Sequence, residues 1–153
     1  MSKLFIGMIA YNGQRFIAKA IESLLAQSHA DLTLLISDDA STDTTQDICE
    51  LYARQDSRVR YHRQEKNIGM INNFNFVIQK SDAPYFMWAS QDDIWEKDFV
   101  KVCIENLNKN LDIGLSFTSV VNIGSRDRIV REFHTLPSLS GKANFWTVLR
   151  YLK

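Results

Sequence analysis

Two pairs of adjacent aspartates, Asp38-Asp39 and Asp92-Asp93, are the residues of this sequence best suited to chemistry. Each pair follows a short apolar segment, and like charges placed this close repel one another. A cation, or hydrogen-bond donors held in place, should therefore offset the repulsion. Mg²⁺ and Mn²⁺ prefer carboxylate and phosphate oxygens, so a divalent cation shared with a bound phosphate is one candidate for that role.

Both pairs also have a structural interpretation. Acidic side chains are favoured at helix N-termini, and Glu96 and Asp98 follow the second pair in a way that fits this. The segment after the first pair could be a turn into a capped helix, and we interpret Ser41, Thr42 and Asp43 in that way. A carboxylate of the same segment could instead accept the imide N–H of a pyrimidine base or a ribose hydroxyl. The residues alone leave these alternatives open.

The aspartate pairs belong to a pattern in which strands alternate with helices. Short apolar segments predict strands over residues 4–10, 32–36, 59–61, 85–88 and 113–121. Apolar side chains at helical spacing predict helices between them, with stripes that begin at Phe16, Ile48, Ile71 and Phe99. The second helix is preceded by a capping signature, Asp43 with Gln46. This alternation predicts an α/β fold, a mostly parallel sheet flanked by helices, which binds ligands at the carboxyl ends of its strands.

Four polar segments follow the first four predicted strands, and their order is informative. They are Tyr11-Asn12-Gly13, Asp38–Asp43, Asn67-Ile68-Gly69 and Gln91-Asp92-Asp93. In this order they resemble the family 2 glycosyltransferases with the GT-A fold, over about residues 4–120. The Gln-Asp-Asp-Ile-Trp form of the last segment is similar to bacterial members that act on surface polysaccharides, including rhamnosyltransferase-like ones.

The resemblance implies a UDP- or dTDP-sugar donor and a divalent metal, Mn²⁺ or Mg²⁺, on its diphosphate. By position, Tyr11 would lie near the base, Asp39 would hold the base, Asp92 would contact the ribose and Asp93 would bind the metal. The implied donor-binding set is completed by Ala10, Asn12, Asn67 and Gly69. Asn75 matches a recurrent asparagine of the family, although the small residues that usually flank it are replaced here by Asn73 and Val77.

The chain divides by resemblance into two parts. Residues 1–125 are predicted to form the nucleotide-sugar-binding domain, and residues 126–153 the start of an acceptor-side segment. This segment is expected to contain a charged hairpin edge at Arg126–Arg131 and a terminal amphipathic helix through Phe145–Leu152. The helix is predicted to pack against a part of the protein beyond it or a second copy in a homodimer, or to touch a membrane surface peripherally.

The function expected from the resemblance is transfer of the sugar to a glycan or lipid-linked acceptor in bacterial polysaccharide synthesis, with inversion. Inverting members need a carboxylate base. That base is expected beyond Lys153, because Asp127 and Glu132 do not match the family's pattern for it. The alternative is a donor-binding module or pseudoenzyme without transfer activity. Two other α/β classes do not fit this sequence. A phospho-signalling receiver would carry its acidic pair after the first strand, where Tyr11-Asn12 stands here, and a dinucleotide site would need the motif Gly-x-Gly-x-x-Gly, which is absent.

Composition excludes some other classes. Lys plus Arg and Asp plus Glu number 18 each, so the net charge of zero argues against a nucleic-acid partner. The basic stretch Arg54–Lys66 is interpreted as a solvated connection. No apolar segment approaches the roughly 18 residues of a membrane span. Cys49 and Cys103 lack metal-binding spacing, which favours reduced thiols in a cytoplasmic protein, at most at the inner face of the membrane.

Overall fold

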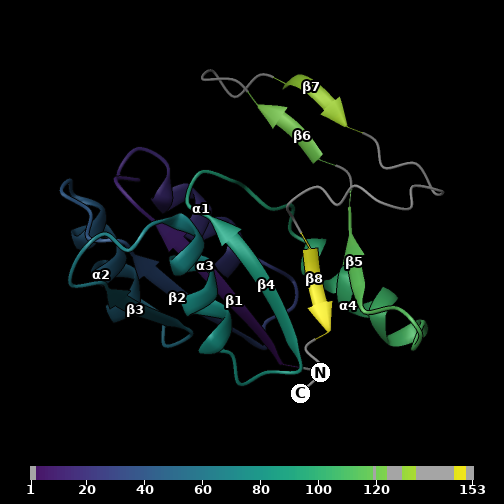
Figure 1. Ribbon diagram of the computed structural model, residues 1–153. Helices are drawn as coiled ribbons and strands as arrows, with labels where there is room; N and C mark the ends of the chain where they lie inside the picture. The colour runs from purple at the N-terminus through teal and green to yellow at the C-terminus, as the bar shows by residue number, and fades with distance from the viewer. Residues whose placement is uncertain (1–2, 119, 124–128, 134–146, 151–153) are drawn as a thin grey trace.

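The computed structural model describes residues 3–118, 120–123, 129–133 and 147–150, and it confirms the α/β fold (Figure 1). The main sheet has the strand order β3-β2-β1-β4-β8-β5. The strands β3, β2, β1 and β4 are parallel to one another, whereas β8 is antiparallel to both β4 and β5. Their bounds are β1 Leu4–Ala10, β2 Leu32–Asp38, β3 Val59–Arg63, β4 Tyr85–Ser90, β5 Leu115–Phe117 and β8 Thr147–Arg150.

Helices cover both faces of the sheet, as the alternating pattern predicts. They are α1 Ile17–Leu25, α2 Thr45–Gln55, α3 Met70–Gln79 and α4 Phe99–Lys109. The apolar residues of α1, α2 and α4 share one buried cluster with inward side chains of the strands. Helix α3 packs on the opposite face, where Val77 joins Phe5, Leu35 and Phe86 in a second cluster. Because β1, β2, β3 and β4 run in parallel, their carboxyl ends form one continuous edge.

The buried face of α3 differs from the predicted stripe. Ile71, which was expected in that stripe, is 72% exposed, and the buried residues are Asn73 and Val77. Asn73 satisfies its amide on the neighbouring strand, since its Nδ2 donates to the carbonyl oxygen of Ser37 at 2.9 Å and its Oδ1 accepts from the Ser37 hydroxyl. The exposed Asn75 makes no comparable contact among the described residues. A hydrophobic pattern cannot reveal a buried polar residue of this kind, because the amide counts as polar wherever it points.

Gly7 explains how the large Val77 fits on the sheet. A Cβ atom at position 7 would lie 2.7 Å from the Cβ of Val77 and 3.1 Å from the ring of Phe86. A contact under 3 Å cannot be accommodated without movement of α3 or β1. The bulk that position 77 adds to the helix is therefore offset by the missing side chain of β1.

We expect Gly7→Ala to lower the free energy of unfolding by about 1–3 kcal/mol, because it overpacks the interface between β1 and α3. Urea unfolding followed by circular dichroism measures the loss. Combining it with Val77→Ala should cost less than the two single substitutions added together, since the two side chains compete for one space. Gly114→Ala is the matched control, because nothing lies within 4 Å of a Cβ there. Additive losses would show that Gly7 and Val77 are not coupled.

The C-terminal part corrects two predictions. The strand expected over 113–121 is divided between β5 and β6 (Val120–Ile123), and β6 pairs with β7 (Ile129–Phe133) in a separate two-stranded sheet. In β5 the small Ser116 is buried whereas Leu115 and Phe117 are each 36% exposed, which is an edge strand and not one buried on both faces.

The prediction of a terminal amphipathic helix is wrong, since Thr147–Arg150 forms the strand β8 between β4 and β5. A short apolar segment does not distinguish helix from strand, and the unpaired edge of β4 favours the strand. Asp127, Phe145, Trp146 and Leu152 lie outside the described residues, and the predicted division at residue 125 stays a prediction.

The start of α2 also differs in detail from the predicted capping pair. The Asp43 carboxylate accepts a hydrogen bond from the backbone N–H of Thr45 at 2.9 Å, as a turn residue would. Gln46 does not reach back to the helix start, because its amide donates to Glu50 one turn further on. Asp43 therefore has the structural role predicted for it, without Gln46 as its partner.

Two further findings concern the described residues as a whole. None of their helices is both long and apolar enough to span a bilayer. Cys49 and Cys103 are buried and unpaired, and burial raises the pKa of the Cys49 thiol to about 12. Both thiols are therefore poor nucleophiles in the folded chain.

Candidate functional site

The loops after β1, β2, β3 and β4 meet at the carboxyl edge of the sheet, and hydrogen bonds join them. The backbone N–H of Asp39 donates to the carbonyl oxygen of Ala10 at 2.8 Å. The backbone N–H of Asn12 donates to the Ser41 hydroxyl at 2.9 Å, and its side-chain oxygen accepts from the N–H of Thr42 at 2.8 Å. Asn12 has a φ of 49°, a left-handed conformation that asparagine tolerates better than most residues. These contacts fix the first loop against the second.

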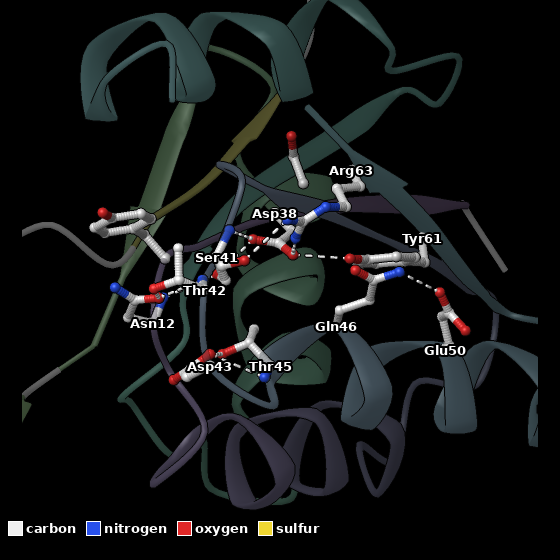
Figure 2. Close-up of polar contacts among 12 residues, drawn as sticks. Asn12, Asp38, Ser41, Thr42, Asp43, Thr45, Gln46, Glu50, Tyr61 and Arg63 are labelled. Atoms are coloured by element: carbon white, nitrogen blue, oxygen red, sulfur yellow. Dashed lines mark hydrogen bonds and ion pairs between the residues drawn. The ribbon is translucent and has the colours of Figure 1, made fainter. Parts of the chain in front are cut away.

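Asp38 is the centre of the polar network in Figure 2, and all its contacts are structural. Its carboxylate is fully buried and accepts from the N–H and hydroxyl of Ser41, from the hydroxyl of Tyr61 at 2.8 Å and from the guanidinium of Arg63 at 2.9 Å. Burial and the bonded Asp38 carboxylate raise the pKa of Tyr61 above its ordinary value. Asp38 therefore holds the loop after β2. Each of its carboxylate oxygens already accepts two hydrogen bonds, so neither has a lone pair free for a ligand.

Arg63 is the residue of this network that sequence reasoning missed. It lies in the stretch interpreted as a solvated connection, and that interpretation is wrong for β3. Arg63 is the direct neighbour of Asp38 in the parallel register of β2 and β3, and its second nitrogen donates to the carbonyl oxygen of Ser41 at 2.9 Å. The pairing of Arg63 with Asp38 follows from the strand register alone, because two residues 25 positions apart form no local sequence pattern.

Asp39 joins the second loop to the third. One of its carboxylate oxygens accepts the backbone N–H of Ile68 at 2.6 Å, and the other accepts that of Gly69 at 3.0 Å. The side chain of Asn67 also accepts the N–H of Gly69, and Gly69 has a φ of 83°, which favours glycine. The Asp39 side chain is oriented by this loop, and each oxygen keeps a lone pair with which it can accept another hydrogen bond.

Gln91 joins the first loop to the fourth. Its side-chain oxygen accepts the backbone N–H of Tyr11 at 2.9 Å, and its side-chain nitrogen donates to the carbonyl oxygen of Tyr11 at 2.9 Å. The Tyr11 side chain is 47% exposed. The loop that carries the exposed tyrosine is thus held next to the loop that carries Asp92-Asp93. Sequence reasoning assigned no role to Gln91.

Asp92 and Asp93 differ in surroundings although they are adjacent. Asp92 is exposed and accepts a hydrogen bond from the Ser90 hydroxyl. Asp93 is half-buried, and burial together with the charge of Asp92 raises its pKa to about 7. Both causes raise the pKa, and no cation of the described residues is among them, whereas the Asp38 carboxylate bonds to Arg63.

The chemical capacity of this edge follows from that contrast. Within the described ranges, no group of three or more His, Cys, Asp or Glu side chains could hold a metal ion by itself. A half-buried carboxylate beside a second, exposed carboxylate suits a divalent cation that takes its other ligands from phosphates and water. The structure thus gathers all the predicted site residues along one edge: Ala10, Tyr11, Asn12, Asp39, Asn67, Gly69, Asp92 and Asp93.

Comparison with known proteins identifies the family. The model of the family described as Glycosyl transferase family 2 matches residues 5–150. The chain belongs to glycosyl transferase family 2. The predicted resemblance and the GT-A fold are confirmed by this match and by the structural neighbours of the family 2 chain.

Relatives and solved structures are similar over part of their length. The family 2 chain is 30% identical over 131 residues to the chondroitin synthase of Escherichia coli, covering 86% of this chain and 19% of that protein. It is 34% identical over 105 residues to the dTDP-rhamnosyl transferase RfbG of Shigella flexneri, covering 65% of this chain and 36% of that protein. The chain therefore spans well under half the length of either relative.

Two solved structures share the fold. S. aureus TarS 1–349 in complex with UDP has a TM-score of 0.65 at 22% identity, covering 70% of this chain and 32% of that chain. The mannosyltransferase PcManGT from Pyrobaculum calidifontis, in complex with GDP-Man and Mn²⁺, has a TM-score of 0.71 at 16% identity, covering 79% of this chain and 36% of that chain. At these identities the likeness concerns the fold alone.

Proposed function

We propose that this chain binds a UDP- or dTDP-sugar with Mn²⁺ or Mg²⁺, for transfer of the sugar to a glycan or lipid-linked acceptor in bacterial polysaccharide synthesis. The observation that carries the proposal is the position of Asp93, half-buried beside Asp92 at the carboxyl edge of the sheet, where burial and the charge of Asp92 raise its pKa to about 7 and a positive charge would be stabilising. A divalent cation bound with a diphosphate would supply that charge. Asp93 would be its protein ligand.

The nucleotide has a place along the same edge. The half-exposed ring of Tyr11 offers a flat surface for a base, and Asp39 retains acceptor capacity for an imide N–H. Asp92 is exposed and could accept a ribose hydroxyl. A dTDP-rhamnosyl transferase among the relatives and a UDP complex among the neighbours support a pyrimidine nucleotide, and the neighbour with GDP-Man and Mn²⁺ supports the cation.

The residues of the chain would contribute mainly by positioning. When bound, a divalent cation would act as a Lewis acid toward the diphosphate as its negative charge grows. Tyr11 and Asp39 would hold the nucleotide so that the sugar projects from the sheet edge toward an acceptor. Inversion and a base beyond Lys153 stay predictions from the resemblance. The homodimer, the peripheral membrane association and the cytoplasmic location stay predictions as well.

Titration calorimetry of the full chain with UDP, dTDP and GDP, each with and without Mn²⁺, tests the proposal. We expect UDP or dTDP to bind, GDP to bind more weakly, and Mn²⁺ to strengthen the binding. Circular dichroism establishes that the chain used is folded. A folded chain that binds none of the three nucleotides, or binds them equally whether or not Mn²⁺ is present, would contradict the proposal.

We expect the Mn²⁺ affinity of the chain in the presence of UDP to fall as the pH is lowered from 8 to 6. A metal ligand must be deprotonated, and Asp93 has a pKa of about 7 before a cation binds, so protons compete with Mn²⁺ below that pH. The limiting loss for one competing proton is about tenfold per pH unit. Mn²⁺ titrations at pH 6, 7 and 8, corrected for the Mn²⁺–UDP association measured without protein, provide the check. An affinity independent of pH would mean that Asp93 does not bind the cation.

A further inference from the structure

The side chain of Gln91 continues the pairing of two strands beyond their ends. The parallel register of β1 and β4 runs as far as Ile9 opposite Ser90. One residue further, the main chain of Gln91 enters a turn, and its side chain bonds to both the N–H and the carbonyl oxygen of Tyr11, each at 2.9 Å. A primary amide offers the same donor and acceptor as a peptide group. Gln91 therefore supplies one more rung between the strands while its backbone is free to turn toward Asp92 and Asp93.

Gly13 leaves the space that this side chain occupies. A Cβ atom at position 13 would lie 2.1 Å from Oε1 and 2.5 Å from Cδ of Gln91, and the third nearest atom also belongs to Gln91. Among the described glycines a positive φ occurs at Gly69 and not at Gly13. Glycine is therefore required at position 13 for the space that it leaves and not for its backbone conformation. The amide end of Gln91 cannot move aside cheaply, because movement would break its two hydrogen bonds to Tyr11.

The far side of the same loop is anchored separately, on α1 and on Gln27 just beyond its end. The backbone N–H of Trp95 donates to the Ser23 hydroxyl at 3.2 Å, and the buried Gln27 amide donates to the carbonyl oxygen of Glu96 at 2.8 Å. The oxygen of Gln27 accepts the N–H of Val100 at 3.0 Å. The loop after β4 would thus keep its attachment to the fold without Gln91, and it would lose its registration against Tyr11.

We propose that Gln91 is a positioning residue that couples the cation site at Asp92-Asp93 to the nucleotide-base site at Tyr11. This inference rests on the proposed function. A nucleoside diphosphate would have to reach both sites at once, with its base at one loop and its phosphates at the other. Fixing the two loops in advance removes the ordering cost that binding would otherwise bear. Each site alone needs no such registration, so Gln91 contributes chiefly to the cooperativity between the base and the cation.

Calorimetry on the full chain and its Gln91→Ala variant separates these contributions. Uridine probes the base site alone, and UDP with and without Mn²⁺ probes the coupling. We expect the variant to bind uridine within about threefold of the unaltered chain, as for a substitution that touches no ligand. We expect the factor by which Mn²⁺ strengthens UDP binding to fall about tenfold or more, which is within the usual range of coupling between sites. By linkage, the factor by which UDP strengthens Mn²⁺ binding must fall equally.

Gly13→Ala tests the same contact without altering Gln91. It should displace the amide and reduce the coupling in the same way, and it should have no further effect on the coupling in a chain that already carries Gln91→Ala. Gln46→Ala is the matched control, because the amide of Gln46 bonds only to Glu50 among the described residues. Thermal unfolding of each variant establishes that it is folded at the temperature of the titration.

The outcomes distinguish the inference from the function on which it rests. If the unaltered chain shows no Mn²⁺-dependent binding of either UDP or dTDP, the proposed function fails and the inference fails with it. If the unaltered chain shows that binding, but Gln91→Ala weakens uridine and UDP by equal factors with the Mn²⁺ effect unchanged, Gln91 has only a structural role. That second result overturns the inference and leaves the proposed function intact.

Discussion

Replacement of Asp93 by asparagine is expected to abolish the strengthening of UDP binding by Mn²⁺ and, at the same time, to stabilise the fold at pH 8. The binding loss follows because an amide is a far weaker ligand than a carboxylate for a hard cation. Loss of a residue that only orients a metal ligand costs about 10–100-fold in metal affinity, so we expect loss of the ligand itself to cost at least as much. Calorimetry with UDP and Mn²⁺ measures the first effect, and urea unfolding without metal measures the second.

The sign of the stability effect follows from the pKa. Asp93 has a pKa of about 7 in the folded chain and an ordinary value of 3.8, so the unfolded chain releases this proton at lower pH than the folded chain does. Asp93 therefore lowers the stability progressively as the pH rises from about 4 to about 7, and the full loss persists at pH 8. Asparagine carries no charge and removes that dependence on pH.

This pair of results separates a cation ligand from an acid that merely decorates a helix start. A carboxylate that stabilised the start of α4 would destabilise the chain when replaced, and the UDP response to Mn²⁺ would be unchanged. Asp98→Asn is the matched control, because Asp98 is exposed at the start of α4 and makes no side-chain capping hydrogen bond. If Asp93→Asn behaves like Asp98→Asn in both measurements, Asp93 does not bind the cation.

Replacement of Asp38 by alanine is expected to lower the free energy of unfolding by about 3 kcal/mol, the low end for breaking a buried ion pair. The low end applies because Arg63 is 35% exposed and its charge can be partly rehydrated. Most of the cost comes from the buried Ser41 and the half-buried Tyr61, whose donors lose their acceptor. A domain is stable by only about 5–15 kcal/mol, so the variant would be markedly less stable. Urea unfolding followed by circular dichroism measures the loss.

Tyr61→Phe provides a graded comparison for Asp38. It removes one donor and leaves the carboxylate bonded to Ser41 and Arg63, so we expect a loss of about 1 kcal/mol. Equal losses in the free energy of unfolding for Asp38→Ala and Tyr61→Phe would show that the contacts of Asp38 with Ser41 and Arg63 add nothing to the stability. Uridine binding measured on the folded fraction should fall in Asp38→Ala as well, because Asp38 holds the loop that precedes the proposed contacts of Asp39.

Continuous apolar segments and helical spacing placed β1, β2, β3, β4 and the four helices correctly, with errors of a few residues at their ends. These elements are predictable because burial on both faces of a parallel strand and on one face of a helix selects apolar residues at fixed periods. The edge on which the polar loops gather followed from the same pattern, since parallel strands place their carboxyl ends together. The sequence thereby determined the fold class and the location of the candidate site.

The tertiary structure alone decided which of these polar residues hold the loops and which are left for a ligand. Asp38 and Asp39 are adjacent in the chain but have different partners. The register of β2 with β3 places Asp38 beside Arg63, whereas Asp39 accepts the backbone N–H groups of Ile68 and Gly69 in the third loop. The contact of Gln91 with Tyr11 joins residues 80 positions apart, and β8 forms a strand because β4 offers it an edge. Such partners depend on strand register and on the packing of distant segments, and these are properties that no local pattern of residues contains.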